Sequence, residues 1–348
     1  MSKEILAKMI QLPSPSGFED MLQEFIASTY KSKDNTFEVL EKGELTAIYN
    51  KKSNFSIMLA SHADEISLIV DGYNEDGTLN VSKNGGVRLK LYIGCQVLII
   101  SNDRSYCYGV MGIKGGIMNK ADVEVEDLFV DCGFNSAEEA IQMVPLGSYV
   151  IHNSYMQDLG NDLITGRALD DRVGDYVIHE AAKKAISLGC KNKILVTTTT
   201  GEENTGRGAY QAVEHYKPNI FVAVDVTYAT DFPGSDDRGH VELNQGGVIC
   251  EGSIPNRQLN KLLKECANEL NLPIQYEVFS GRTGTDADTA IKSSFAPATV
   301  LYSIPLRYMH SPSEVVSFKD VENMIDVLAL FLTKLSSDTN LLPYNINE

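Results

Sequence analysis

Residues 56–65, SIMLASHADE, decide the fold, because an apolar run there ends abruptly in polar residues. This pattern is typical of a strand that is buried on both faces of a sheet and is followed by a loop at its carboxyl end. Similar runs recur at 193–200 (KILVTTTT), 219–228 (NIFVAVDVTY) and 298–305 (ATVLYSIP). Segments with helical periodicity alternate with them, at 175–189, 208–216, 256–270 and 318–335. Strands that alternate with helices predict an α/β domain with a largely parallel sheet and helices on both faces.

Between residues 67 and 162 the pattern changes to short strand-like runs separated by Gly and Asn turns. One such run is VRLKLYIG at 87–94, and a single helix is expected at 136–144. Many short strands with turn signals predict an all-β barrel or sandwich. We therefore expect one α/β domain formed by residues 1–66 and 163–348, with an all-β, barrel-like domain of residues 67–162 inserted into it.

The charge balance and the cysteines limit the class of protein. The 348-residue chain has 30 Lys and Arg against 47 Asp and Glu, a formal charge of −17. Nucleic acids and anionic membranes need a basic face, so the balance argues against both partners. The sequence contains no membrane-spanning run, and charged residues interrupt the apolar N-terminal segment, which argues against a signal peptide. The six cysteines form no CxxC pair. We predict a cytoplasmic protein with free thiols.

Polar side chains follow the buried strands at the points where the strands end. They are His62 and Asp64 after the first run, Glu202 and Glu203 after the second, Asp225 within the third and His310 after the fourth. Asp170 lies in ALDDRVGD, just before the helix at 175–189. Ligands of open α/β sheets bind outside the carboxyl ends of the strands, so we expect these side chains to meet at one edge.

So many carboxylates would repel one another at low dielectric unless cations neutralise them. Taken singly, the motifs have structural explanations: a His at a strand end is usually a surface residue, and ALDDRVGD is also a typical helix cap. Asp225 is harder to explain, because a carboxylate inside an apolar strand needs a partner. Together the motifs predict two divalent metal ions per subunit. His and carboxylate ligands favour zinc or cobalt, with manganese as an alternative.

In order along the chain, these motifs resemble those of metallopeptidase family 42, the TET or glutamyl/leucyl aminopeptidases, whose members are often labelled endoglucanases or cellulases. The matching segments are HADE, ALDDRVGD, GEEN with GRGA, AVDVT, GTDAD and RYMHSPSEVV. The resemblance implies a zinc-exopeptidase-like fold, in which a mixed sheet with a parallel core carries the site. It also implies that the inserted domain joins subunits into a dodecamer whose enclosed chamber admits short peptides.

Carried over position by position, the resemblance implies five metal ligands. Asp170 bridges the two metals, His62 and Asp225 bind one of them, and Glu203 and His310 bind the other. The peptide bond between Asp170 and Asp171 is expected to be cis.

The resemblance also implies the remaining roles. Glu202 is the general base that acts on a metal-bridging water, and Asp64 orients the ring of His62. Gly284, Thr285 and Asp286 line the substrate cleft. The implied activity is removal of N-terminal residues from short peptides.

Other interpretations stay open: a carboxypeptidase, dipeptidase or deacylase with a related two-metal core, or a non-catalytic binding protein of the same fold. In those related enzymes the extra domain usually follows the Glu pair and the next Asp ligand. Here the insertion lies between His62 and Asp170, which favours the aminopeptidase. The presence of every ligand and of the base argues against a binding protein. A glycosidase fits poorly, because it needs two carboxylates but neither metals nor His.

Overall fold

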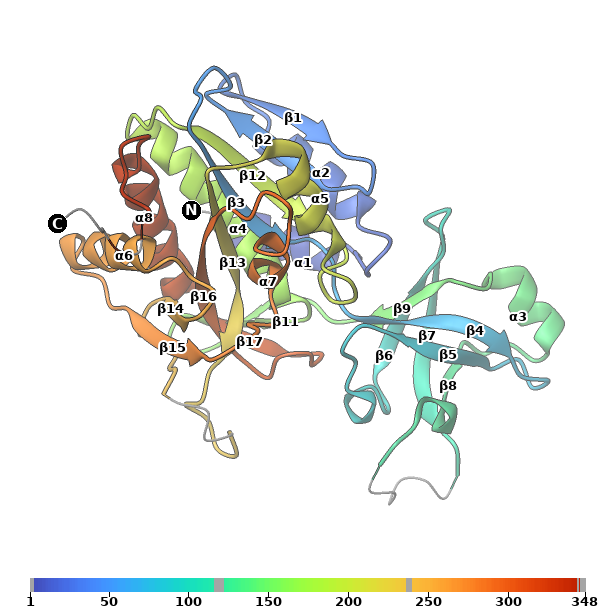
Figure 1. Cartoon of the computed structure of the whole chain (residues 1–348). Coiled ribbons are helices and arrows are strands. Elements are labelled where there is room, and N and C mark those ends of the chain that lie inside the picture. The colour runs from blue at the N-terminus through green and yellow to red at the C-terminus, as the bar shows by residue number, and fades with distance from the viewer. Residues whose placement is uncertain (1–2, 116–121, 236–239, 343, 345–348) are drawn as a thin grey trace.

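The computed structural model describes residues 3–115, 122–235, 240–342 and 344. It contains a broad sheet with helices on both sides and, set apart at one end of it, a small β-barrel (Figure 1). Among the described residues, no helix combines the length and the apolar character needed to cross a membrane.

The core of the sheet is parallel, as the buried runs predict. Strand β3 (Ser56–His62) lies between β12 (Lys193–Thr199) and β13 (Ile220–Tyr228), and β16 (Ala298–Arg307) follows β13; these neighbours all pair in parallel. Antiparallel strands extend both edges and make the sheet mixed: β1 (Asn35–Val39) and β2 (Leu45–Tyr49) on one side, and β17 (Glu314–Ser317), β11 (Leu163–Gly166) and β10 (Gln157–Asp158) on the other. A branch formed by β14 (Val248–Gly252) and β15 (Gln275–Phe279) joins the sheet at β16.

Alternate residues of β3 face two separate hydrophobic clusters, which explains why every residue of this strand is buried. Ile57 and Leu59 pack in the larger cluster, and Met58 and Ala60 pack in the smaller one. The larger cluster is covered by α1 (Lys3–Gln11), α2 (Asp20–Tyr30), α4 (Leu169–Ser187), α6 (Arg257–Glu269) and α8 (Phe318–Lys334). The smaller cluster is covered by α5 (Arg207–Tyr216) and the short α7 (Asp286–Ala290). The sheet is therefore the middle of three layers.

The inserted segment forms a closed antiparallel barrel with its own hydrophobic cluster, so the expected all-β insertion is confirmed. Its strands follow the order β4-β5-β8-β7-β6-β9 around the barrel. They are β4 (Ser67–Tyr73), β5 (Leu79–Asn84), β6 (Gln96–Ile100), β7 (Tyr106–Ile113), β8 (Leu128–Asp131) and β9 (Tyr149–His152). The expected helix at 136–144 is present as α3 (Ala137–Met143), and a short 3₁₀ turn, η2 (Val125–Asp127), precedes β8.

The strand expected at 87–94 is wrong. This segment contains a 3₁₀ turn, η1 (Leu89–Leu91), in which the N–H groups of Leu91 and Tyr92 donate to the carbonyls of Arg88 and Leu89. Val87, Leu89 and Tyr92 are buried in the barrel cluster, while Leu91 is exposed. Burial at this uneven spacing suits a turn that packs against the barrel better than a strand with a period of two.

Candidate metal centre

The first half of the candidate site is built around His62, the last residue of β3, whose side chain is almost fully buried. Its Nε2 lies 3.0 Å from Oδ1 of Asp170 and 3.8 Å from Oδ1 of Asp225. Its Nδ1 lies 3.0 Å from the carbonyl oxygen of Asp64 and 3.6 Å from the carboxylate of the same residue. With Nδ1 held in this way, Nε2 points at two carboxylates from distant parts of the chain.

The second half is built around His310, which follows β16. Its Nε2 lies 3.3 Å from Oδ2 of Asp170 and 3.4 Å from Oε1 of Glu203. Its Nδ1 lies 3.1 Å from the carbonyl oxygen of Gly86, in the inserted segment just after β5. The inserted segment therefore helps to position a residue of the site.

The structure brings the five proposed ligands together as two groups. One group is His62, Asp170 and Asp225, the other is Asp170, Glu203 and His310, and the candidate ligand atoms within each group lie within 4.8 Å of one another. Asp170 belongs to both groups because one of its carboxylate oxygens faces each imidazole.

The turn that carries Glu202 and Glu203 is fixed by Asp64. The backbone N–H groups of Glu202 and Glu203 donate to the two oxygens of the Asp64 carboxylate, at 3.0 and 3.2 Å. The hydroxyl of Ser16 donates to the same carboxylate at 2.6 Å. Asp64 is fully buried, and it ties the loops that follow β3 and β12 to each other.

The peptide bond between Asp170 and Asp171 is cis, as the family resemblance implies. Helix α4 begins at Leu169, earlier than the periodicity predicts, although Asp170 and Asp171 themselves have non-helical dihedrals. The Asp171 carboxylate accepts hydrogen bonds from the hydroxyl of Ser61 at 2.6 Å and from the N–H of Gly174 at 3.1 Å. A Cβ at Gly174 would lie 2.3 Å from the Asp171 carboxylate, so this packing requires glycine.

Sequence reasoning missed one buried carboxylate at the site. Glu314, at the start of β17, accepts hydrogen bonds from the backbone N–H groups of Asp170 at 3.0 Å and His310 at 2.7 Å. It therefore holds the backbones of two proposed ligands. Its place within RYMHSPSEVV, four residues after His310, is the only signal that the sequence offers.

The electrostatics of the cluster fit divalent cations. Burial raises the pKa of the Glu202 and Asp225 carboxyls well above their usual range, and neighbouring carboxylates add to the shift. Burial also raises the pKa of Asp286 to about 6. Buried carboxylates that resist ionisation together can all be charged when cations lie between them. Imidazole and carboxylate ligands suit zinc, cobalt or manganese better than calcium.

A cavity of about 590 Å³, which we call the catalytic cavity, opens beside these groups. Both metal-ligand groups and Glu202 contribute to its lining, as do Gly284 and Thr285. Asp286 lies behind the wall, where its carboxylate accepts a hydrogen bond from the hydroxyl of Thr199 at 2.6 Å, and it is not among the lining residues. Thr285 also caps α7 by accepting a hydrogen bond from the N–H of Ala287.

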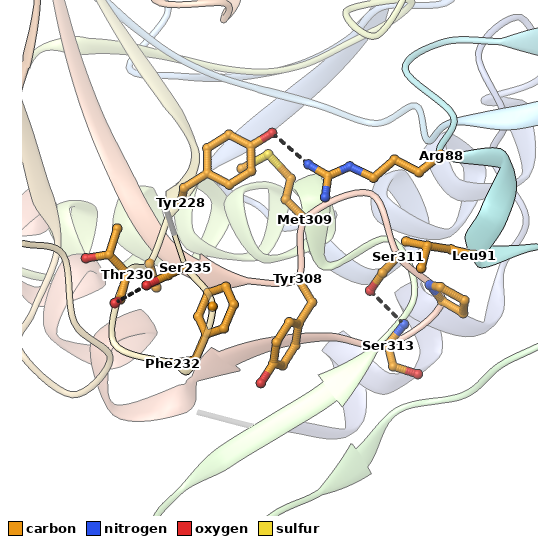
Figure 2. A pocket seen from close by; sticks show the side chains of 13 residues that line it. Arg88, Leu91, Tyr228, Thr230, Phe232, Ser235, Tyr308, Met309, Ser311 and Ser313 are labelled. Carbon is orange, nitrogen blue, oxygen red and sulfur yellow. Dashed lines mark hydrogen bonds between the residues drawn. The ribbon is translucent and has the colours of Figure 1, made fainter. Parts of the chain in front are cut away.

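A second cavity, of about 660 Å³, adjoins the catalytic cavity (Figure 2). Tyr228, Thr230 and Met309 line both. Arg88 enters from the inserted segment, and its guanidinium lies 3.4 Å from the hydroxyl of Tyr228. The cavity thus lies where the barrel segment meets the sheet domain.

A parallel-cored sheet that gathers two His and several carboxylates at the carboxyl ends of its strands defines a class of protein, the metal-dependent hydrolases. The family model for M42 glutamyl aminopeptidase matches residues 43–327. The lysyl aminopeptidase of Pyrococcus furiosus is 29% identical over 343 residues, which cover 95% of this chain and 97% of the relative.

Solved structures agree with this match. The TET aminopeptidase of the marine archaeon Thaumarchaeota archaeon SCGC AB-539-E09 has a TM-score of 0.90 at 26% identity, covering 97% of this chain and 98% of that one. The TET1 peptidase of Pyrococcus horikoshii, which can assemble into a tetrahedron or a large octahedral shell, has a TM-score of 0.84 at 26% identity, covering 96% and 99%. The chain belongs to the M42 glutamyl aminopeptidase family and is a metal-dependent aminopeptidase.

Proposed function

We propose that this chain removes N-terminal residues from short peptides with the help of two divalent metal ions. The observation that carries the proposal is the pair of ligand groups that share Asp170. His62 and Asp225 would hold one ion, Glu203 and His310 the other, and Asp170 would contact both. When bound, such ions lower the pKa of water toward 7 and polarise the scissile carbonyl.

Glu202 is the general base of the proposed reaction. It lines the catalytic cavity but belongs to neither ligand group, so its carboxylate is available for proton transfer. It takes a proton from the attacking water and returns it to the leaving amine. Asp64 acts at a distance from the substrate: it holds the backbone of Glu202 and Glu203 and fixes the orientation of the His62 ring.

The acidic lining of the catalytic cavity suits the free amine at the N-terminus of a peptide, since this amine is cationic at neutral pH. A carboxypeptidase would need a cation beside the same groups to bind the terminal carboxylate. Among the described residues, no Lys or Arg lines the catalytic cavity, and Arg88 lines the second cavity. We infer that the N-terminus of the substrate enters the catalytic cavity and that the residues after it extend into the second cavity.

We further propose that residues 67–162 join subunits into a closed, dodecameric shell, within a cytoplasmic protein. Three residues support an interface on the barrel: Tyr106, Tyr108 and Val110 alternate along β7 and are 45% exposed or more. An apolar stripe of this kind on one face of a strand is typical of a protein contact. All proposed metal ligands come from one chain, so the chemistry does not require the contact.

The test of the proposed activity combines metal removal with blocked substrates. We expect the purified protein to hydrolyse aminoacyl anilides and free-amine dipeptides but not their N-acetylated versions. It should lose this activity in excess chelator. Zinc or cobalt should restore it, and elemental analysis should find two ions per subunit. Full activity after prolonged chelation would refute the metal mechanism, and hydrolysis of N-acetylated peptides from their C-terminus would favour the carboxypeptidase alternative.

A further inference from the structure

One carboxylate of the catalytic cavity has no part in the proposed reaction. Glu277, on β15, lines this cavity together with the metal-ligand groups. Its Oε1 accepts a hydrogen bond from the hydroxyl of Ser303 at 3.0 Å, and its Oε2 accepts one from the hydroxyl of Thr227. The two hydroxyls hold the carboxylate in place, and neither carries a compensating charge.

The position of Glu277 relative to the proposed ligand Asp225 follows from the strand register. Thr227 lies two residues after Asp225 on β13, so their side chains share one face of the sheet. Ser303, on β16, is the direct partner of Asp225. Two residues along a strand span about 6.6 Å. The Glu277 carboxylate is therefore held by one hydroxyl two residues along the strand from the proposed ligand Asp225 and by a second hydroxyl directly opposite Asp225.

No Lys, Arg or His of the described chain forms an ion pair with Glu277. The guanidinium groups in this region have other partners: Arg282 lies 3.5 Å from Asp288, and Arg307 lies 2.7 Å from Asp231. Burial raises the pKa of Glu277, which means that its surroundings in the protein disfavour its charge. A cation from a bound molecule would remove this penalty.

Apolar side chains also line the catalytic cavity. Val241, Phe279 and Leu301 line the same cavity. Such walls accommodate the methylene groups of a long side chain, whose charged end then reaches the carboxylate. A purely apolar side chain would fit the walls but would leave Glu277 without a partner.

We propose that Glu277 selects peptides whose N-terminal side chain carries a cation, that is, lysine or arginine. This inference rests on the proposed function, because it assumes that the scissile bond lies at the two ligand groups. Binding places the α-amine among the acidic residues of the site, the methylene groups against the apolar walls, and the side-chain cation on Glu277. The alternative is a structural role, in which Glu277 only ties β13, β15 and β16 together through Thr227 and Ser303.

The test compares the anilides of lysine and norleucine, which share the same carbon chain and differ in the ammonium that ends the lysine side chain. We expect the wild-type protein to have a kcat/KM for lysine roughly ten- to hundredfold above that for norleucine, the usual range for a buried hydrogen bond to a charged group. Glu277→Gln keeps the size and removes the charge, so it should bring this ratio close to one, chiefly by lowering kcat/KM for lysine.

Glu251→Gln is the matched control, because Glu251 lies on the adjacent strand β14, outside the cavity lining. It should keep the wild-type ratio. An unchanged lysine preference in Glu277→Gln, with normal norleucine turnover, would overturn the inference and leave the proposed function intact. A wild-type preference for norleucine would overturn it even if the variant failed to fold. If the metal-loaded wild type hydrolysed no aminoacyl anilide and no free-amine dipeptide, the proposed function itself would fail.

Discussion

Glu202 and Glu203 are adjacent, yet the structure gives their side chains different surroundings. The carboxylate of Glu203 lies 3.4 Å from His310 Nε2 in one ligand group, whereas Glu202 belongs to neither group. We expect Glu202→Gln to keep near-normal metal content while turnover falls about 10²–10⁴-fold, the usual contribution of general acid–base catalysis. Glu203→Gln should instead lose one ion per subunit and regain part of its activity at high metal concentration. Metal titration followed by elemental analysis distinguishes the two.

The reverse pattern, metal loss in Glu202→Gln and full metal content in an inactive Glu203→Gln, would mean that the two roles are exchanged. Normal turnover in both variants would place the reaction elsewhere. Because the backbone of both residues is anchored by Asp64, the two variants should have similar thermal stability when both are metal-free, and this similarity serves as the control.

Arg88 provides a prediction about the far end of the substrate. Its exposed guanidinium lines the second cavity, where the C-terminal carboxylate of a short peptide would lie. Arg88→Gln should raise KM about two- to fivefold for a free tripeptide, the range of an exposed ion pair, and leave KM for the C-terminally amidated tripeptide unchanged. Equal effects on both peptides would show that Arg88 does not contact the carboxylate. High salt should also reduce the preference of the wild-type protein for the free tripeptide over the amidated one, because salt screens an exposed ion pair.

Most of the proposed ligands could be predicted from the sequence because each follows a recognisable apolar run. His62 ends a visible strand, and this position indicates where its side chain lies. Asp225 lies inside its strand and stands out as a carboxylate in an apolar run. Glu314 and Glu277 could not be predicted in this way. Glu314 acts through backbone N–H groups that become neighbours only in the folded chain, and Glu277 reaches Thr227 and Ser303 across strands whose pairing the sequence does not reveal.

At the scale of elements, a buried ion cluster joins three segments of the sheet domain. Glu65, after β3, pairs with Arg167, before α4, and with Arg172, within α4. It also accepts a hydrogen bond from the N–H of Ser14, in the loop between α1 and α2. Both guanidinium groups are 5% exposed or less. Because one carboxylate pairs with both buried guanidinium groups, its loss removes the ion-pair partner that they share.

We therefore expect Glu65→Gln to lower the free energy of unfolding by about 3–5 kcal/mol, the cost of breaking a buried ion pair. Lys261→Ala removes an exposed pair with Glu265 on α6 and should cost less than about 1 kcal/mol. Urea unfolding of both variants at one fixed metal concentration checks this difference. Equal free energies of unfolding in the two variants would show that water or a local rearrangement compensates for the lost partner of the two arginines.

The elements that the sequence pattern predicts wrongly, or does not predict, lie where tertiary packing decides the local structure. The segment at 87–94 has the composition of a strand, but it forms the turn η1, since Val87, Leu89 and Tyr92 pack into the barrel cluster. The strand β17 was not expected, because four residues carry too short a pattern. The long, fully apolar strands were expected correctly because burial on both faces leaves an unambiguous signal.

At the scale of the whole molecule, the barrel lies at one end of the sheet domain (Figure 1). Along β7 the exposed residues Tyr106, Tyr108 and Val110 alternate with less exposed neighbours, among them the fully buried Met111 of the barrel cluster. The hydroxyl of Tyr106 lies 3.6 Å from Met21 Sδ, so this end of the stripe already contacts α2. Tyr108 and Val110 are the better candidates for contact with a second subunit.

Tyr108→Glu is the decisive variant for the proposed assembly, because it places a charge in the middle of the apolar stripe and leaves the barrel core unchanged. We expect light scattering and analytical ultracentrifugation to find a closed oligomer for the wild type and single subunits or small oligomers for the variant. Hydrolysis of a small aminoacyl anilide should persist, since one chain supplies every proposed ligand. Tyr210→Glu is the control. Tyr210 is exposed on α5 of the sheet domain, so this substitution should leave the assembly intact.

A wild-type monomer at micromolar concentration, or an unchanged oligomer in Tyr108→Glu, would contradict the proposal that β7 forms the contact. If instead the variant dissociates and begins to cleave longer or folded polypeptides from their N-terminus, then the shell, and not the catalytic cavity, is what restricts the protein to short peptides.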